Sequence, residues 1–255
     1  MIGVDVLDAR DEPYGLTLAQ LEGRLYPRSA QAALPDDDFV GASSDGFLLP
    51  GQRLNEVRAA DDALIAAHGL TWDMLAAALE DFMDSPKEKL DAREARVGLE
   101  AIGVAQAAEA LLDMFIYFVE PRFLLFERVT LDTQECPWGC RDPEKNISGV
   151  PVYSGAEIAV LNMDTGYGFT AGSMIIHLIR AHQFCEGPGA RFRTDPIQVA
   201  RTLSLLKTGT EPLTRLPLFR QLRSAARALD RLPANLDWFA EFLRPRESSA
   251  DPFAP

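Results

Sequence analysis

Five residues in one part of the chain have the side chains that a metal ion needs. They are Cys136, Cys140, His177, His182 and Cys185, which include all three cysteines and two of the three histidines. Thiolate sulfur and neutral imidazole nitrogen are the usual ligands of zinc in small structural sites. We therefore expect a zinc ion to bind Cys136, Cys140, His177 and His182, with Cys185 as the substitute ligand.

The spacing of the two histidines restricts this hypothesis. At about 100° per residue, positions 177 and 182 lie about 140° apart on a regular helix. Both imidazoles reach one ion only if the helix loosens at its C-terminal end, which Gly187 and Gly189 allow. His182 and Cys185 are three residues apart and share a helical face, so Cys185 is the alternative ligand.

Two alternatives to a metal site stay open for the same residues. Free cysteines are often plain buried apolar residues, and His182 continues an apolar line on its helix, so the group could simply be part of a core. Cys136 and Cys140 could otherwise form a redox pair. The usual reactive spacing is Cys-x-x-Cys at a helix N-terminus, which differs from the spacing here.

The number of ligands decides what the ion would do. Four protein ligands close the site and make the ion structural, whereas three leave a position for a water molecule and make it catalytic. In the second case, Glu157 and Glu186 are the nearest candidates for a general base. Neither is singled out by a motif.

A glycine-rich stretch after the second histidine, EGPGARFRTDP at 186–196, carries Arg191 and Arg193. Their guanidinium groups could bind the phosphate or carboxylate of an anionic ligand. We favour a simpler role, in which the stretch only connects two helices and its arginines pair with acidic residues of the same chain.

Other catalytic motifs are not found. The sequence contains no GxxxxGK[ST], no strand-linked GxGxxG, no GxSxG and no HExxH. No catalytic residue is therefore assigned, and the sequence leaves open whether the protein is an enzyme.

Helices and strands are predicted from hydrophobic periodicity and from capping residues. In the N-terminal half, Thr71 is the expected N-cap of the second of two paired helices, and SPKE at 85–88 predicts the start of a long helix ending before Pro121. Further on, Asp195 followed by Pro196 predicts another helix start. The expected helices cover 16–26, 53–83 as a pair, 85–119, 170–184, 195–207, 218–232 and 235–243; the expected strands are 122–131 and a hairpin over 157–169.

These elements predict an α+β fold that is predominantly α-helical. A helical body would carry a small zinc-finger-like module of hairpin and helix in the region 122–187. We divide the chain into an acidic, mainly helical region (1–120), the strand-knuckle-hairpin-helix module (121–190), basic C-terminal helices that pack on the body (191–246) and a flexible tail (247–255).

The net charge of −13 is unevenly distributed. The N-terminal region is acidic, whereas residues 190–246 have eleven Lys and Arg against five Asp and Glu. An acidic body repels nucleic acid, so nucleic acid is not an expected partner. A stripe of arginines at 220, 223, 227 and 231 is typical of a solvated helix face. Without a signal peptide or a membrane-spanning segment, we expect a cytoplasmic protein and no membrane partner.

The favoured hypothesis follows from the closed ligand set and the missing catalytic motifs. It is a non-enzymatic cytoplasmic protein with a structural zinc site that binds another, unknown macromolecule. The first alternative is a metal-dependent hydrolase acting on a small anionic substrate. The second is a nucleic-acid-associated protein that uses its basic C-terminal helices.

Overall fold

The centre of the fold is an antiparallel sheet whose described strands lie in the order in which they occur along the chain. The computed structural model describes residues 6–30, 45–89, 114–119, 122–141, 152–162, 164–165 and 167–207. Within these residues the sheet contains β1 (Lys87–Lys89), β2 (Phe115–Val119), β3 (Phe123–Glu135), β4 (Tyr153–Asn162) and β5 (Gly168–Gly172). Each strand pairs with the next one, so the sheet is a meander.

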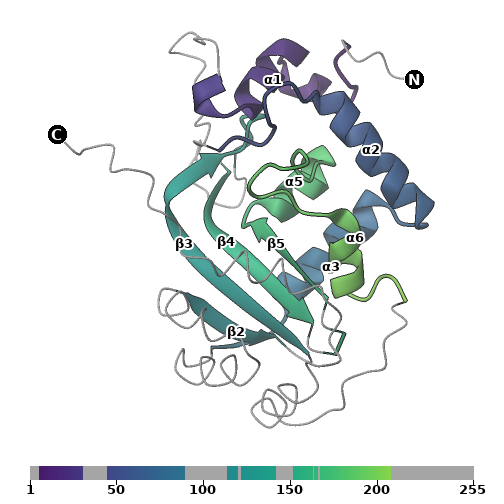
Figure 1. Cartoon of the computed structure of the whole chain (residues 1–255), viewed down its shortest axis with the longest axis vertical. Helices are drawn as coiled ribbons and strands as arrows, with labels where there is room; N and C mark the ends of the chain where they lie inside the picture. Colours follow the sequence, from purple (N-terminus) through teal and green to yellow (C-terminus); the bar gives the residue numbers. More distant parts are fainter. Residues whose placement is uncertain are drawn as a thin grey trace, which may run out of the picture.

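The helices of the described residues lie outside this sheet. They are the 3₁₀ turns η1 (Glu12–Tyr14) and η2 (Arg28–Ala30), and the helices α1 (Leu18–Leu25), α2 (Leu54–Ala67), α3 (Trp72–Asp84), α5 (Ile175–His182) and α6 (Pro196–Thr202). Figure 1 shows α3, α5 and α6 together on one side of the sheet, and α1 near the end where α2 begins. Within the described residues, no helix is both long and apolar enough to cross a lipid bilayer.

One hydrophobic cluster fills the space between the sheet and the helices. Side chains at alternate strand positions point to the same face, so Leu125, Val160 and Phe169 meet in the cross-strand register. We call this the sheet cluster. Its members are Ile65, Leu70, Trp72, Leu75, Ala76, Leu79, Phe82, Val119, Phe123, Leu125, Ile158, Val160, Phe169, Ala171, Ile175, Ile179, Cys185, Ile197, Val199 and Ala200.

A second hydrophobic cluster lies around the turn that follows β3. It joins α1 and the start of α2 to this turn and to α5, and it includes two residues from the segment that precedes α2. We call it the knuckle cluster. Its members are Leu18, Leu21, Leu25, Phe47, Leu48, Leu54, Val57, Cys136, Trp138, Met174, Leu178 and Phe184.

The predominantly helical fold predicted from the sequence is wrong. The structure is a mixed α+β fold built on an antiparallel sheet, and the predicted hairpin-and-helix module of 122–187 is not a small appendage. Its strands β3, β4 and β5 are the continuation of β1 and β2, which come from the part predicted to be helical.

The main error is the long helix expected over 85–119. Ser85 is the C-cap of α3, where its hydroxyl donates to the Asp81 carbonyl, and does not start a helix. Lys87–Lys89 and Phe115–Val119 are the paired strands β1 and β2. A short apolar run such as FIYFV fits a buried strand as well as a helix, and only its long-range partner β3 decides between them.

Several other local predictions agree with the structure. Thr71 caps α3, and Asp195 caps α6 with Pro196 in the first turn, although α6 ends at Thr202 and not at the predicted position 207. The helix expected over 16–26 is α1, whose capping box at Thr17 was not predicted. The strand at 122–131 and the hairpin at 157–169 are confirmed, although β3 runs to Glu135. The predicted helices at 218–232 and 235–243, the arginine stripe and the tail lie outside the described residues.

Candidate metal centre

The first two candidate ligands belong to a tight turn at the end of β3. The Cys136 amide donates to the Val152 carbonyl at 2.8 Å, and the Val152 amide donates to the Cys140 carbonyl at 3.0 Å. Between them the Gly139 amide donates to the Cys136 carbonyl, with Gly139 at φ +75°, a conformation that favours glycine. The CPWGC sequence therefore folds into a turn that holds both sulfurs on one side of the start of β4.

The two histidines come from α5, and His182 is the last residue of this helix. Gln183 has a left-handed conformation with φ 49°, and the amides of Gln183 and Phe184 bond back to the carbonyls of Ile179 and Leu178. The chain leaves the helical path only after His182, so both histidines lie within α5 and their Nε2 atoms approach to 3.2 Å without the loosening that the sequence predicted. The prediction that the helix would begin at 170–173 is wrong, because Met174 is its N-cap.

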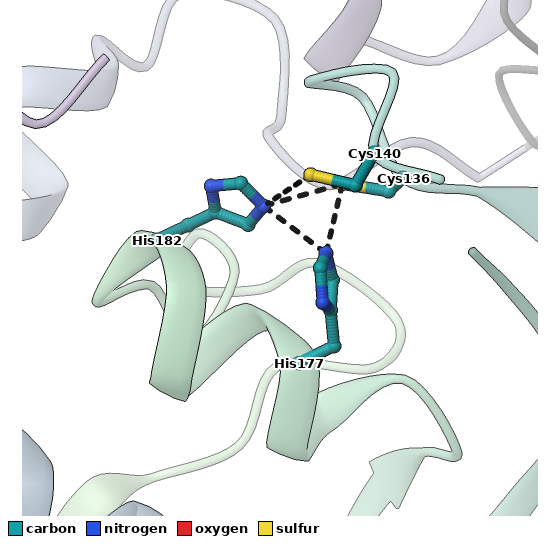
Figure 2. Close-up of side chains that lie close together, drawn as sticks. All are labelled: Cys136, Cys140, His177 and His182. Carbon is teal, nitrogen blue, oxygen red and sulfur yellow. Dashed lines mark hydrogen bonds between the residues drawn. The ribbon is translucent and has the colours of Figure 1, made fainter. Parts of the chain in front are cut away.

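The four side chains converge on one point (Figure 2). Nε2 of His182 lies 3.3 Å from Cys136 Sγ, 3.4 Å from Cys140 Sγ and 3.2 Å from His177 Nε2. Nε2 of His177 lies 3.3 Å from Cys136 Sγ, and all four donor atoms lie within 4.8 Å of one another. The cluster has the ligands and the size to hold a metal ion.

These separations are close to the edges of a zinc tetrahedron. With Zn–N of about 2.0 Å and Zn–S of about 2.3 Å, a tetrahedral site has N–N edges of about 3.3 Å and S–N edges of about 3.5 Å. Four of the six separations between the donor atoms are 3.2–3.4 Å and require shifts of only a few tenths of an ångström. The arrangement is compatible with zinc.

The protonation states also suit a cation. The hydrogen bond from Cys136 lowers the pKa of Cys140 to about 3, and hydrogen bonds from His177 and His182 act in the same direction. Burial is the main cause that raises the pKa of Cys136. Burial also lowers the pKa of His182, which favours the neutral imidazole that a metal binds. Cys140 therefore favours the thiolate form before any metal binds, whereas a bound cation would have to displace the proton of Cys136.

The four candidate ligands differ in their exposure. Cys136 and His182 are buried, each at 1% exposure, whereas Cys140 and His177 are half-buried. The centroid of the Tyr14 ring lies 5.1 Å from that of His182. Burial and the neighbouring Cys140 raise the pKa of Tyr14 to about 12, so the phenol keeps its proton.

The substitute ligand does not join this group. Cys185 is completely buried in the sheet cluster, where burial raises the pKa of its thiol well above the ordinary value. Because the helix ends at His182, the three-residue spacing of His182 and Cys185 no longer places them on one helical face.

Both arginines of the candidate anion site pair with carboxylates of the same chain. Arg193 forms a two-pronged ion pair with Asp61, with N–O distances of 2.6 and 2.5 Å. Arg191 pairs with Asp45 at 2.5 Å and lies 3.5 Å from Glu157. These contacts agree with the favoured expectation that the arginines neutralise acidic residues of the body. Anion binding at this loop stays a prediction.

The two general-base candidates have other contacts. Glu157 pairs with Arg128 at 3.2 Å as well as with Arg191. Glu186 is 2% exposed, and burial is the main cause that raises its pKa well above the ordinary value. Neither carboxylate belongs to the group of four donor atoms.

Sequence reasoning missed three residues beside the centre, namely Asp11, Arg58 and Trp138. Trp138 lies within the CPWGC motif, and this position between the cysteines is the signal that could have found it. Arg58 could also have been found, because it lies four residues after Leu54 and seven before Ile65, on the buried side of its helix. Asp11 carries no such signal, since only the tertiary structure brings it to the centre.

No protein-family model matches the chain, and neither a curated protein nor a solved structure matches it significantly. The chemistry of the four donor atoms and the packing around them are therefore the basis for any functional conclusion.

Proposed function

We propose that this chain is a zinc protein in which the ion is structural, and that the protein acts by binding another macromolecule and not by catalysis. The observation that carries the proposal is the convergence of Cys136, Cys140, His177 and His182 within 4.8 Å. Two sulfurs and two nitrogens are the number and kind of ligands that a closed tetrahedral zinc site uses.

The chemistry of the ligands supports zinc as the metal. Two thiolates and two imidazoles suit Zn²⁺, whereas Mg²⁺ and Ca²⁺ prefer oxygen ligands in larger coordination shells. The four side chains also come from two separate segments, the turn after β3 and the end of α5. An ion here would cross-link these segments next to the knuckle cluster.

The same ligand set supports a structural role. Four protein ligands fill a tetrahedron and leave no position for a reactive water. In addition, Glu157 forms ion pairs with Arg128 and Arg191, and burial raises the pKa of Glu186, which favours its protonated form. Neither carboxylate is therefore well suited to act as a base at the centre. The proposed binding role rests on this lack of a catalytic arrangement among the described residues, and a cytoplasmic location stays part of the proposal.

Metal analysis of the full chain, purified without a histidine tag, tests the proposed site. We expect about one equivalent of zinc in the wild type and in Cys185→Ala, and almost none in Cys140→Ala. Cys185→Ala is the matched control, because it removes the third thiol from a buried position outside the group. Equal zinc loss in both variants, or a wild type that binds no zinc, would contradict the proposal.

A substrate panel tests the non-enzymatic role. Phosphate esters, carboxylic esters and amides are incubated with the zinc-loaded wild type and with Cys140→Ala, and we expect the same background rate for both. A metal-dependent turnover that Cys140→Ala abolishes would identify a hydrolase and overturn this part of the proposal.

A further inference from the structure

A buried ion pair lies directly beside the metal centre. Arg58 of α2 is completely buried and holds Asp11 with both of its terminal nitrogens, Nη1 at 2.6 Å from Oδ2 and Nη2 at 3.0 Å from Oδ1. Two charges that are removed from water in this way need further hydrogen bonds to offset the cost of desolvation. Both groups find such bonds at residues of the centre.

Asp11 and Arg58 contact the two segments that carry the ligands. The indole Nε1–H of Trp138, in the turn between the two cysteines, donates to Asp11 Oδ1 at 2.7 Å. Arg58 Nη2 donates to the main-chain carbonyl of His182 at 2.7 Å, at the C-terminal end of α5. A cation is favourable at this end of a helix, so one ion pair joins the turn and the helix end.

The ring of His182 is oriented by stacking. It lies nearly parallel to the Trp138 ring, with centroids 3.9 Å apart and an interplanar angle of 11°. A metal-bound histidine usually donates its second ring nitrogen to a carboxylate or carbonyl, which fixes the ring. Among the described residues, no group bonds to Nδ1 of His182, which is buried. The stacked indole of Trp138 therefore holds the imidazole of His182 in its orientation.

We propose that Asp11, Arg58 and Trp138 are positioning residues of the metal centre and set its affinity for zinc. Asp11 fixes the Trp138 indole, the indole fixes the imidazole plane of His182, and Arg58 fixes the backbone of the same histidine. This inference rests on the proposed zinc site and extends it to residues from the N-terminal segment and α2, far from the four ligands in the sequence.

The chain contains a matched control for this network. Asp61 lies three residues after Arg58 on α2 and forms the comparable ion pair with Arg193. This pair is also largely enclosed, with side-chain exposures of 5% and 17%. Arg193 donates to the carbonyl of Glu186, and the pair has no contact with the four donor atoms.

Zinc affinity of the full chain, measured by competition with a chromogenic chelator, tests the proposal. We expect Asp11→Asn and Trp138→Phe to weaken zinc binding by about 10- to 100-fold. Asp61→Asn should lose stability but keep the wild-type affinity. The absorption spectrum of the cobalt-substituted protein is a second measurement, and it should change in Asp11→Asn and Trp138→Phe while Asp61→Asn keeps the wild-type spectrum.

The outcomes separate the inference from the proposed function. A wild type that binds neither zinc nor cobalt overturns the metal site itself. A wild type that binds zinc, with equal losses of affinity in Asp11→Asn and Asp61→Asn, overturns only the positioning role. Trp138→Phe removes no charge, so it decides the question alone if Asp11→Asn does not fold, and wild-type affinity in Trp138→Phe contradicts the proposal.

Discussion

The sheet cluster and the knuckle cluster are stabilised in different ways. In the sheet cluster, neighbouring strands supply continuous backbone hydrogen bonds, and three helices cover the apolar face. In the knuckle cluster, α1 is joined to the segment before α2 by two backbone bonds, from the amides of Phe47 and Leu48 to the Leu25 carbonyl. The four candidate ligands and the ion pair of Asp11 and Arg58 lie at the knuckle cluster.

This difference suggests a physical reason for the place of the candidate metal centre. Segments that pair as strands satisfy their own backbone groups and hold one another in register. The segments of the knuckle cluster have few such pairs, so side-chain contacts must hold them together. The proposed cross-link between the turn and α5 would stabilise segments that do not pair with each other as strands.

Removal of zinc should produce the largest contrast between the two clusters. A chelator should strip hydrogen-exchange protection from α1, the turn at 136–140 and the end of α5, while β3, β4 and β5 keep theirs. At a zinc concentration of about 1,000 times the dissociation constant, the lost stabilisation is about 4 kcal/mol. Equal loss of protection in the sheet would contradict the distinction between the clusters.

A substitution that creates a cavity should lower the free energy of unfolding by a similar amount in either cluster. The two substitutions should differ in their effect on zinc affinity. Leu21 and Leu75 are both completely buried, one in each cluster. Leu21→Ala and Leu75→Ala should each lower the free energy of unfolding by about 2–5 kcal/mol in urea titrations. Only Leu21→Ala should weaken zinc binding, because Leu21 packs in the cluster of Cys136. A comparable loss of zinc affinity in Leu75→Ala would show that the clusters are not separate.

Glu186, which lies where the two clusters meet, should make the stability of the fold depend on pH. It follows Phe184 of the knuckle cluster and Cys185 of the sheet cluster, and its raised pKa means that the folded protein holds its proton above the ordinary value of 4.5. A carboxyl of this kind stabilises the fold below its unfolded pKa, and this contribution is lost as the pH rises toward the folded pKa.

The Glu186→Gln variant measures this contribution. Its free energy of unfolding, relative to wild type, should increase from about pH 4.5 upward by at most about 1.4 kcal/mol per pH unit. Urea unfolding of both proteins at several pH values gives the difference. The charged groups that act on Glu186 are Arg193 and Asp45, so the ion pair of Arg193 must stay intact in the variant. A pH-independent difference would contradict the buried, neutral carboxyl.

Two helix caps should give the smallest effects. Thr17 accepts a hydrogen bond from the Gln20 amide at the start of α1, and Thr71 accepts one from the Met74 amide at the start of α3. Replacement of either by alanine should cost about 1 kcal/mol in unfolding experiments. If α1 is coupled to the centre, Thr17→Ala should weaken zinc binding by up to about fivefold, and Thr71→Ala should not. Identical zinc affinities in the two variants would show that the stability of α1 does not affect the metal centre.

The four residues of the candidate cluster could be chosen from the sequence because local patterns point to them. CPWGC predicts a tight turn, which the structure contains, whereas the loosening of the helix expected for His177 and His182 is not found, since both lie within α5. The predicted caps at Thr71 and Asp195 are local as well, since each hydroxyl or carboxylate bonds to an amide within three residues.

The errors concern contacts between distant residues. Phe115–Val119 is a strand because Phe123–Glu135 lies beside it, and no local pattern in FIYFV separates a strand from a buried helix. Ser85 has the same chemistry as an N-cap and as a C-cap, and the end of α3 uses it as the latter. Asp11 was missed for the same reason, because its partner Trp138 is distant in sequence.

The bond between Trp138 and Asp11 also has a consequence for synthesis of the protein. These residues are separated by 127 positions. At about 5–20 residues per second, a ribosome adds Trp138 about 6–25 s after Asp11. The described strands pair with their neighbours in chain order, so the meander can assemble as it emerges, whereas the early N-terminal segment must wait. During this interval the leucines of α1 lack Cys136 and Trp138, their later neighbours in the knuckle cluster.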